Sequence, residues 1–322
     1  MSAPDPTSDG VRRVLMLTHT GRAQAREVAQ ACCKALTAQG IVLRLPASEA
    51  ADLDLDPASF DPPLELTAAE AGAGAGRDCE LALVIGGDGT ILRAAEIVHA
   101  SGTPVLGVNL GHVGFLAEAE YDAVESTIDA IVHRRYTAEE RLTLDVRVYR
   151  DGELVSTTFA LNEASVEKAA RERMLEVVVE VDGRPLSRWG CDGVVCATPT
   201  GSTAYNFSAG GPVVWPAVEA LLMVPISAHA LFARPMVVAP TSVLAVELMA
   251  RADGAGVLWC DGRRAVDLPP GARIEVRRGE QPIRLVRLHD SPFTDRLVAK
   301  FDLSVEGWRG RAERRRRGDD DA

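Results

Sequence analysis

The sequence predicts an α/β unit built on a parallel sheet, followed by a mainly antiparallel β unit. In the first 140 residues, short apolar runs alternate with helical patterns, which is typical of strand-helix-strand units. From residue 142 onward, short alternating segments are separated by Asp-Gly pairs, which are typical of β-hairpins. A length of 322 residues is enough for about two domains with separate cores.

The chain begins with a predicted strand, helix and second strand at residues 14–18, 23–39 and 41–45, and Gly40 ends the helix. These elements form a βαβ unit, which places the two strands parallel in one sheet. Residues 47–77 are rich in Ala, Asp, Pro and Gly, and we expect an irregular insertion there.

The first unit is organised around residues 81–85, an apolar run that predicts a buried strand. The residues that follow it directly are Gly86, Gly87, Asp88, Gly89 and Thr90. Glycine lacks a β-carbon, so a ligand can lie on the amide groups of this turn. Thr90 is predicted to cap a helix over about residues 90–100, whose free amides would face the same spot. The stretch therefore predicts a phosphate-binding turn.

Asp88 suggests the chemistry of this turn. A carboxylate beside anions is repelled unless it holds a metal or takes a proton from a hydroxyl. The pattern thus favours phosphoryl transfer onto an alcohol. Taken alone, Gly-Gly-Asp-Gly is equally compatible with a tight strand-to-helix turn, because glycine and aspartate are common turn residues.

Another buried strand is predicted at residues 104–109, and it ends in the glycine-containing loop 110–116. Two neighbouring parallel strands with open carboxyl-end loops form a crevice, which is where ligands bind in open α/β sheets. A predicted helix over about residues 121–133 completes the first unit.

In the β-rich part, residues 192–212 form a stretch dominated by hydroxyl groups, small residues and Tyr205. Such groups can bind the base edge and the amide of a nucleoside, while a tyrosine covers a ring face. Serine hydrolysis is an alternative because Ser208 lies in half of a nucleophile elbow, but Asn206 stands where that motif requires glycine.

Asn162 and Glu163 follow a predicted strand at residues 158–161. If both side chains enter the crevice, the carboxylate can bind a ribose diol and the amide a base or hydroxyl. The alternative is ordinary surface polarity. For His229, we favour a packed core histidine over a ligand-binding one.

Composition excludes several classes of protein. The net charge of −11 argues against a general nucleic-acid binder, which needs a basic face. The six cysteines show no C-x-x-C pair or zinc spacing, and the polar N-terminus lacks the pattern of a signal peptide, so we expect a cytoplasmic protein. No apolar run is long enough for a membrane span. The tail, residues 309–322, is predicted to be disordered.

Two common nucleotide motifs are missing. No Walker sequence occurs, so phosphates must be held by other glycine loops. No G-x-G-x-x-G occurs either, because Arg77 stands where the third glycine of the nearest candidate belongs. A dehydrogenase that transfers hydride is therefore disfavoured.

An ordered set of motifs resembles the bacterial NAD kinase family, and especially its actinobacterial type. The matching stretches are residues 86–90, 109–116, 162–163, 192–212, 229–235 and 260–263. They span about residues 84–308, and their order is far more specific than any single motif.

The resemblance implies phosphorylation of the 2′-hydroxyl on the adenosine ribose of NAD, giving NADP. The implied phosphate donor is ATP, with polyphosphate as an alternative donor and Mg²⁺ or another divalent cation as cofactor. It also implies a Rossmann-like N-terminal domain, a β-rich C-terminal domain, a nucleotide site between them, and a homo-oligomer such as a dimer or tetramer. No nucleic-acid or membrane partner is expected.

In this family, the aspartate that matches Asp88 is the proposed general base. The implied contacts to NAD come from Asp88, Gly89, Arg93, Asn162, Glu163, Arg173, Asp192, Thr203, Ala204, Tyr205 and Ser208. Asn162 and Glu163 are expected on the ribose and adenine side, and Asp192 at the amide end of NAD. The phosphate-binding residues are expected to be Gly86, Gly87, Gly89 and Thr90, and no metal held by protein side chains is expected.

The predicted domain limits follow from these patterns. We expect a disordered N-terminus at residues 1–12, followed by an α/β nucleotide-binding domain at 13–140 and a β-rich NAD-binding domain at 141–288. Residues 289–308 are expected to pack back on the first domain. Two rival functions remain at this stage: another Gly-Gly-Asp-Gly kinase that acts on a lipid or sugar phosphate, and a non-catalytic NAD(P)-binding regulator.

Overall fold

A computed structural model of the chain describes most of its residues. The described ranges are 10–68, 72–109, 114–119, 123–170, 174–250, 254–289 and 292–305. The predictions for Arg173, for residues 110–113 of the glycine loop and for the two tails fall outside these ranges.

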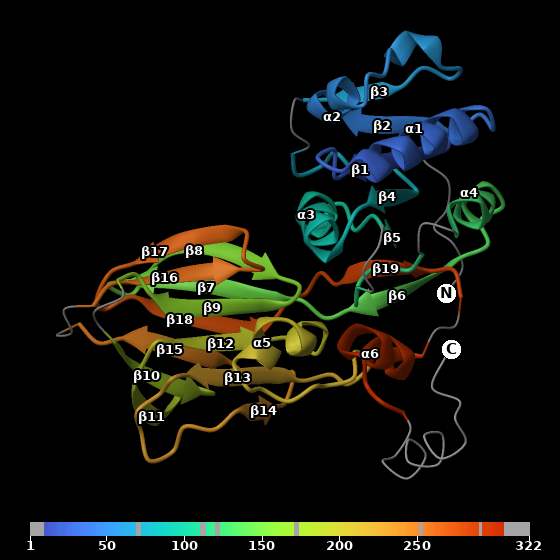
Figure 1. Cartoon of the computed structure of the whole chain (residues 1–322). Helices are drawn as coiled ribbons and strands as arrows, with labels where there is room; N and C mark the ends of the chain where they lie inside the picture. Colours follow the sequence, from blue (N-terminus) through green and yellow to red (C-terminus); the bar gives the residue numbers. More distant parts are fainter. Residues whose placement is uncertain are drawn as a thin grey trace, which may run out of the picture.

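Within the described residues, seven strands form the sheet of the α/β unit, in the order β3-β2-β1-β4-β5-β19-β6 (Figure 1). The strands are β1 (Arg13–Thr18), β2 (Val42–Pro46), β3 (Glu65–Thr67), β4 (Leu81–Ile85), β5 (Val105–Val108), β6 (Thr137–Arg141) and β19 (Ile283–Arg287). All neighbours pair in parallel except β19 and β6, which pair antiparallel. The predicted parallel sheet is confirmed.

Helices cover both faces of this sheet, and Figure 1 shows α3 and α4 on opposite sides of it. The helices are α1 (Ala23–Thr37), α2 (Ala47–Asp52), α3 (Asp88–Val98) and α4 (Val124–Val132). Successive side chains of a strand point to opposite faces. Leu81, Leu83 and Ile85 therefore join a core with α1, whereas Ala82 and Val84 join a core with α3.

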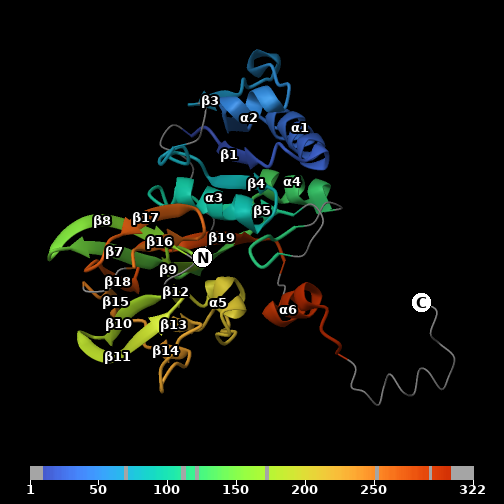
Figure 2. The same cartoon turned by 60° about the vertical axis from the view of Figure 1, so that its left-hand side comes forward.

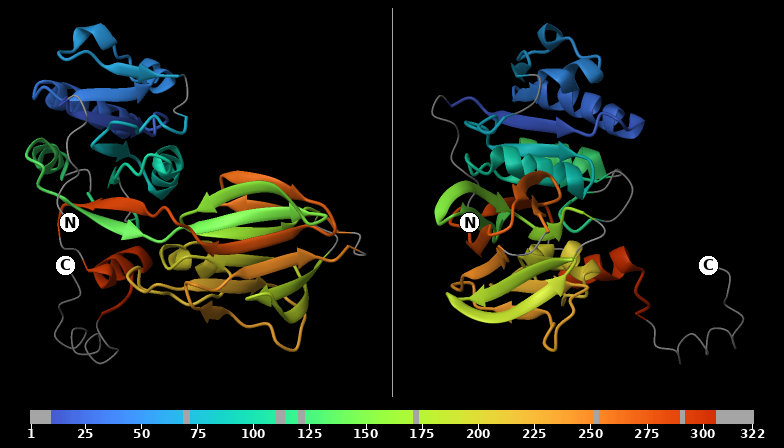
Figure 3. Two further views of the ribbon diagram at one scale, coloured as in Figure 1. Left: turned by 180° about the vertical axis from the view of Figure 1, so that it is seen from behind. Right: turned by 90° about the vertical axis from the view of Figure 1, so that its left-hand side faces the viewer.

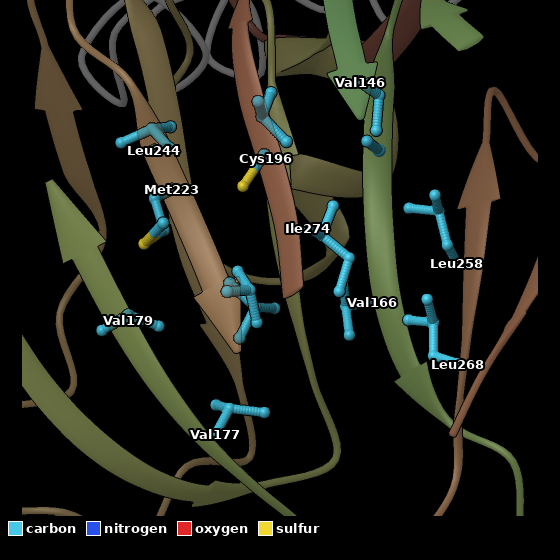
Figure 4. Close-up of a cluster of buried hydrophobic side chains, with 14 of the residues drawn as sticks. Val146, Val166, Val177, Val179, Cys196, Met223, Leu244, Leu258, Leu268 and Ile274 are labelled. Atoms are coloured by element: carbon cyan, nitrogen blue, oxygen red, sulfur yellow. The ribbon is translucent and has the colours of Figure 1, made fainter. Parts of the chain in front are cut away.

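The β-rich part is a sandwich of two antiparallel sheets that, in the described residues, have six strands each. The first sheet contains β7 (Leu144–Arg150), β8 (Glu153–Ala160), β10 (Leu175–Val181), β11 (Arg184–Cys191), β15 (Leu244–Leu248) and β18 (Arg273–Arg278). The second contains β9 (Glu163–Lys168), β12 (Gly193–Ala197), β13 (Leu221–Ile226), β14 (Met236–Val238), β16 (Gly256–Cys260) and β17 (Arg264–Leu268). Buried side chains of both sheets meet in one apolar core, part of which Figure 4 shows.

Three of the four Asp-Gly pairs make the predicted hairpins. The pairs that begin at Asp151, Asp182 and Asp261 have positive φ at both residues and join strands that pair with each other. The prediction for Asp192 is wrong. This residue connects β11 to β12, which lie in different sheets, so the chain crosses the sandwich there instead of turning back.

The insertion at residues 47–77 is more regular than predicted. It contains α2, a short 3₁₀ helix (Pro57–Ser59) and β3, which extends the parallel sheet beyond β2. The pairing of β3 with β2 is a tertiary contact, so composition alone does not reveal it.

The end of the chain returns to the first sheet. Strand β19 inserts between β5 and β6, although the sequence prediction assigned residues up to 288 to the β-rich part. Helix α6 (Phe293–Phe301) follows and lies beside the short helix α5 (Tyr205–Ser208) at the junction of the two units (Figures 2 and 3). Among the described helices, none has the length and apolar content that a membrane crossing requires.

Candidate active site

The Gly-Gly-Asp-Gly turn connects β4 to α3. A β-carbon on Gly86 would fall within 3.0 Å of the Thr90 hydroxyl oxygen, so only glycine fits under the first turn of the helix. The helix begins at Asp88 with Gly87 as its N-cap. The prediction that Thr90 caps the helix is therefore wrong, because Thr90 lies inside the first turn and is buried against Gly86.

The Asp88 side chain is held by backbone amides. Its two carboxylate oxygens accept hydrogen bonds from the amides of Phe115, at 3.1 Å, and Leu116, at 3.3 Å. The carboxylate also lies so close to Gly114 that a β-carbon there would collide with it. Asp88 stands in the first turn of α3, where the helix dipole favours a negative charge. These contacts leave the carboxylate fixed in one orientation.

A cavity of about 550 Å³ lies beside the same turn. The described residues that line it are Thr18, His19, Thr20, Gly21, Arg22, Gly87, Gly89, Thr90, Arg93 and Arg263. Three arginines and the N-terminus of α3 make the cavity suited to phosphate groups. Asp88 is not among these lining residues, because its carboxylate faces residues 114–116 instead.

Arg93 is positioned by a buried carboxylate from the insertion. Glu49, in the first turn of α2, forms an ion pair with Arg93 at 2.7 Å and accepts a hydrogen bond from the Thr18 amide at 2.6 Å. Burial raises the pKa of Glu49, and the neighbouring Arg93 opposes that rise. Glu49 was not predicted as a site residue, because the insertion carries no motif. Its role depends on the fold that brings α2 beside α3.

Asn162 and Glu163 stand at the entry to β9, and both are buried. The backbone before β9 is fixed by Asp261, whose carboxylate accepts hydrogen bonds from the amides of Leu161 and Asn162. Arg264 pairs with Asp261 at 2.9 Å. Asp261 belonged to a motif that the sequence singled out, but its role in holding another loop was not predicted.

Glu163 lies in an unusual environment for a carboxylate. Burial and the nearby Asp261 raise its pKa to about 8, although the Tyr205 amide donates a hydrogen bond to it. Among the described residues, the Oε2 atom is buried without a hydrogen-bond partner. Such an orphaned acceptor is suited to a hydroxyl group of a ligand.

The loop after β12 is packed against the Asn162 backbone. Thr198 donates its hydroxyl to the Leu161 carbonyl and its amide to the Asn162 carbonyl. A β-carbon on Gly201 would fall within 3.0 Å of that same Asn162 carbonyl. The buried side chain of Asn206 donates to the carbonyls of Ser202 and Pro212. Internal hydrogen bonds therefore fix the shape of this loop.

Among the predicted dinucleotide-pocket residues, Tyr205 donates its backbone amide to the Glu163 carboxylate. Burial raises the pKa of Tyr205, and the charges of Glu167, Glu163 and Asp192 add to the effect. Thr203 ends the 3₁₀ helix Thr200–Thr203, Ala204 separates that helix from α5, and Ser208 is exposed at the end of α5.

Asp192 lies at the far end of β9 from Glu163. Its carboxylate pairs with Lys168 at 2.6 Å, and this contact lowers the pKa of Asp192. Glu163 and Lys168 are the first and last residues of β9, roughly 17 Å apart along the strand. The prediction of a core histidine at position 229 is wrong, since His229 is exposed and its amide donates to the Gly190 carbonyl.

Two contacts join the parts of the site. Leu161 packs in the same apolar cluster as Ile91 of α3 and Leu116. Arg263, which follows Asp261 in its hairpin, lines the cavity and pairs with Glu96 of α3 at 3.1 Å. The backbone before Asn162 is thereby tied to the helix that begins at Asp88.

The fold and the site define a nucleotide-binding phosphotransferase made of an α/β unit and a β-sandwich. Two family models match the chain: the ATP-NAD kinase N-terminal domain over residues 14–136 and the ATP-NAD kinase C-terminal domain over residues 161–288. NAD kinase 2 of Streptomyces coelicolor is 59% identical over 94% of this chain and 99% of its own length. The NAD kinase of Thermobifida fusca is 57% identical over 95% of this chain and 94% of its own.

The chain belongs to the NAD kinase family, and the resemblance predicted from its motifs is confirmed. The fold agrees with solved structures at lower identity. Yeast NADH kinase complexed with NADH has a TM-score of 0.82 at 24% identity, covering 92% of this chain and 89% of that one. An NAD kinase from Archaeoglobus fulgidus in complex with ATP has a TM-score of 0.65 at 24% identity. The match covers 91% of this chain and 99% of that one.

Proposed function

We propose that this protein is an NAD kinase that transfers the terminal phosphate of ATP to the 2′-hydroxyl on the adenosine ribose of NAD. The observation that carries this proposal is Asp88, a carboxylate fixed by two amides at the start of a helix and next to an arginine-lined cavity. A protein that only binds NAD(P) has no need for such a carboxylate beside phosphate-binding groups. Polyphosphate could bind the same cavity as an alternative donor.

The cavity supplies the contacts for the phosphates. The amides of Gly87 and Gly89 lie at the start of α3, and Arg93 and Arg263 line the cavity together with the loop of residues 18–22. Backbone amides and guanidinium groups can bind phosphate oxygens and neutralise their charge. In phosphoryl transfer, this positioning and neutralisation account for most of the catalysis.

Asp88 is the proposed general base. As the 2′-oxygen forms its bond to the terminal phosphorus, the bond between that phosphorus and the bridging oxygen of ADP breaks. The hydroxyl proton passes to the Asp88 carboxylate, so charge and atoms balance. The amides of Phe115 and Leu116 keep this carboxylate pointing in one direction, which lowers the entropic cost of reaching the reactive arrangement.

We propose that NAD lies along β9. The orphaned oxygen of Glu163 would accept a ribose hydroxyl, with Asn162 beside it on the adenosine side. Tyr205 would cover a ring between the two ends, because the charges of both Glu163 and Asp192 raise the pKa of its phenol. Asp192, at the other end of the strand, would contact the amide end. The separation of the two ends suits an extended dinucleotide better than a mononucleotide.

We propose that a divalent cation enters this site as a companion of ATP. Among the described residues, no group of three or more His, Cys, Asp or Glu side chains could hold a metal. Mg²⁺ often binds through phosphates and one or two carboxylates, and Asp88 is the carboxylate within the turn itself. When bound, the ion would neutralise charge on the transferring phosphate. Magnesium as the ion, a homo-oligomeric state and a cytoplasmic location are also proposals. So are the domain limits given above, except that β19 belongs to the α/β sheet.

The test is direct. The purified chain is incubated with NAD, ATP and Mg²⁺, and NADP is measured with a dehydrogenase that requires it. We expect NADP to form only when all three components are present. Parallel reactions with polyphosphate, with NADH and with a lipid or sugar-phosphate acceptor define the substrates, and transfer to such an acceptor without NADP formation would contradict the proposal.

A further inference from the structure

The C-terminal helix contacts the segment that holds Asp88, and that contact is unexplained by substrate binding. Residues 115–117 precede Glu118, whose amide and that of Ala119 donate to the Gly107 carbonyl of β5. Among the described residues, these hydrogen bonds anchor the far end of the segment to the sheet. Its near end supplies the two amides to Asp88, and the C-terminal helix supports it there.

Arg296 of α6 supplies that support. Its guanidinium donates to the carbonyl of Ala117 at 2.7 Å and to that of Phe115 at 3.3 Å, and it pairs with Glu118 at 2.7 Å. The Arg296 side chain is only 10% exposed. Because this guanidinium has three acceptors on one segment, it fixes both the position and the orientation of that segment.

Glu118 ties the rest of the C-terminal segment to the same place. Its buried carboxylate accepts hydrogen bonds from the amides of Leu288 and His289 and pairs with Arg287 as well as Arg296. The chain that leaves β19 is therefore bound to residue 118 before it enters α6. The helix cannot shift without straining these bonds.

The same helix also contacts the proposed dinucleotide loop. Phe301 packs on Phe207 of α5, with ring centres 4.7 Å apart, and on Phe115, at 5.9 Å. Phe293 packs on Phe115 and on Trp215. One helix thus contacts both the segment that orients Asp88 and the loop that carries Tyr205. Figure 2 shows α6 beside α5 at this junction.

We propose that Arg296 is a positioning residue for the phosphoryl transfer. It holds the peptide of residues 115–117 so that the Phe115 and Leu116 amides fix Asp88, while Phe301 of the same helix supports the dinucleotide loop through Phe207. This inference rests on the proposed role of Asp88. It assigns to the C-terminal helix a function in turnover that is separable from substrate affinity.

The test compares Arg296→Ala, Arg296→Lys and Phe301→Ala with Lys300→Ala, a control at an exposed position of the same helix. For each variant, kcat, the KM for NAD and for ATP, the NAD dissociation constant and the melting temperature are measured. We expect Arg296→Ala to lower kcat about 10- to 100-fold with NAD affinity within about twofold, because a misplaced base slows chemistry without removing binding contacts. The lysine variant should recover part of this loss, since an ammonium can still donate to one carbonyl.

The expected result for Phe301→Ala is the reverse, a raised KM and dissociation constant for NAD with a smaller change in kcat. Lys300→Ala should match the wild-type protein. A kcat within about twofold of wild type for Arg296→Ala would overturn the inference, as would an equal loss of turnover and NAD affinity. If Arg296→Ala does not fold, Arg296→Lys carries the test, with an expected loss of kcat of several-fold at unchanged affinity and an unchanged kcat as the contrary result.

A double variant separates this inference from the proposed function. In an Asp88→Asn background, Arg296→Ala should lower kcat little further, because its effect on kcat is exerted through the position of Asp88. If the two reductions in kcat multiply fully in the double variant, Arg296 does not act through Asp88. If Asp88→Asn alone keeps full turnover, the proposed base is wrong. If Asp88→Asn loses turnover and Arg296→Ala does not, only the role of the helix fails.

Discussion

The two halves of the site are built by different means. At the end of β4, the glycines of the turn bring bare backbone to the surface, and Asp88 is the one charged side chain in it. In the β-sandwich, the Asn162 backbone is held by buried polar side chains, among them Thr198 and Asp261. The first half is suited to phosphates and the second to a nucleoside with many distinct polar atoms.

This difference has a consequence for mutation. A site made of backbone amides loses little binding when a neighbouring side chain changes, so chemistry and affinity can be separated there. A site held by interlocked buried hydrogen bonds transmits any change to its neighbours, because each lost partner leaves another polar group unsatisfied.

The largest effect is expected from Asp88→Asn. The amide cannot accept the hydroxyl proton, so turnover should fall about 10²- to 10⁴-fold, while NAD affinity stays close to wild type because binding rests on other groups. Turnover is measured by NADP formation and affinity by calorimetry. Full activity in this variant would remove Asp88 from the role of base.

Gly201→Ala tests the interlocked half. The new β-carbon would meet the Asn162 carbonyl, so the loop or β9 must move, and we expect about 1–3 kcal/mol of lost stability together with weaker NAD binding. Gly72→Ala is the matched control, because a β-carbon there meets no described residue within 4 Å. Denaturant unfolding and NAD titration measure both effects. Equal behaviour of the two variants would show that the loop is not tightly packed.

Glu163→Gln tests the raised pKa. In the native protein the carboxyl pKa is raised to about 8 from the ordinary 4.5, so the native state keeps a proton that the unfolded chain has lost. The free energy of unfolding should therefore fall as pH rises from about 5 to 8, by roughly 2–4 kcal/mol from this group. The glutamine variant cannot ionise, so its stability should vary less over that range. If the free energy of unfolding varies with pH in the same way in both proteins, the pKa of Glu163 is not raised.

The smallest effect is expected from Tyr205→Ala. Loss of one ring face should weaken NAD binding by about 1 kcal/mol, or roughly fivefold, with kcat less affected. An unchanged NAD dissociation constant for Tyr205→Ala would place the ring outside the pocket.

Local patterns predicted the elements whose cause is local. The strand predicted at residues 81–85 matches β4, because a short unbroken apolar run before a glycine turn is compatible with few other structures. The same reasoning failed at Asp192, because an Asp-Gly pair looks the same whether the chain turns back or crosses to another sheet. The backbone conformation distinguishes them, since Asp151 and Asp182 have positive φ and belong to true hairpins.

Tertiary roles were the hardest to predict. Glu49 lies in a stretch without motif or periodicity, yet it holds both Arg93 and the Thr18 amide. Asp261 fixes a backbone about 100 residues away, and Arg296 supports one about 180 residues away. In the sequence, each of these is a single charged residue without a distinctive pattern for its role around it. Only the fold shows which groups it contacts.

The most direct test of the account is a crystal structure of the protein with NAD bound. The account predicts that the 2′-oxygen of the adenosine ribose lies within hydrogen-bonding distance of the Asp88 carboxylate, with Glu163 on a ribose hydroxyl and the phosphate cavity open beside it. An adenosine ribose bound elsewhere, with Asp88 facing no hydroxyl of the coenzyme, would contradict it.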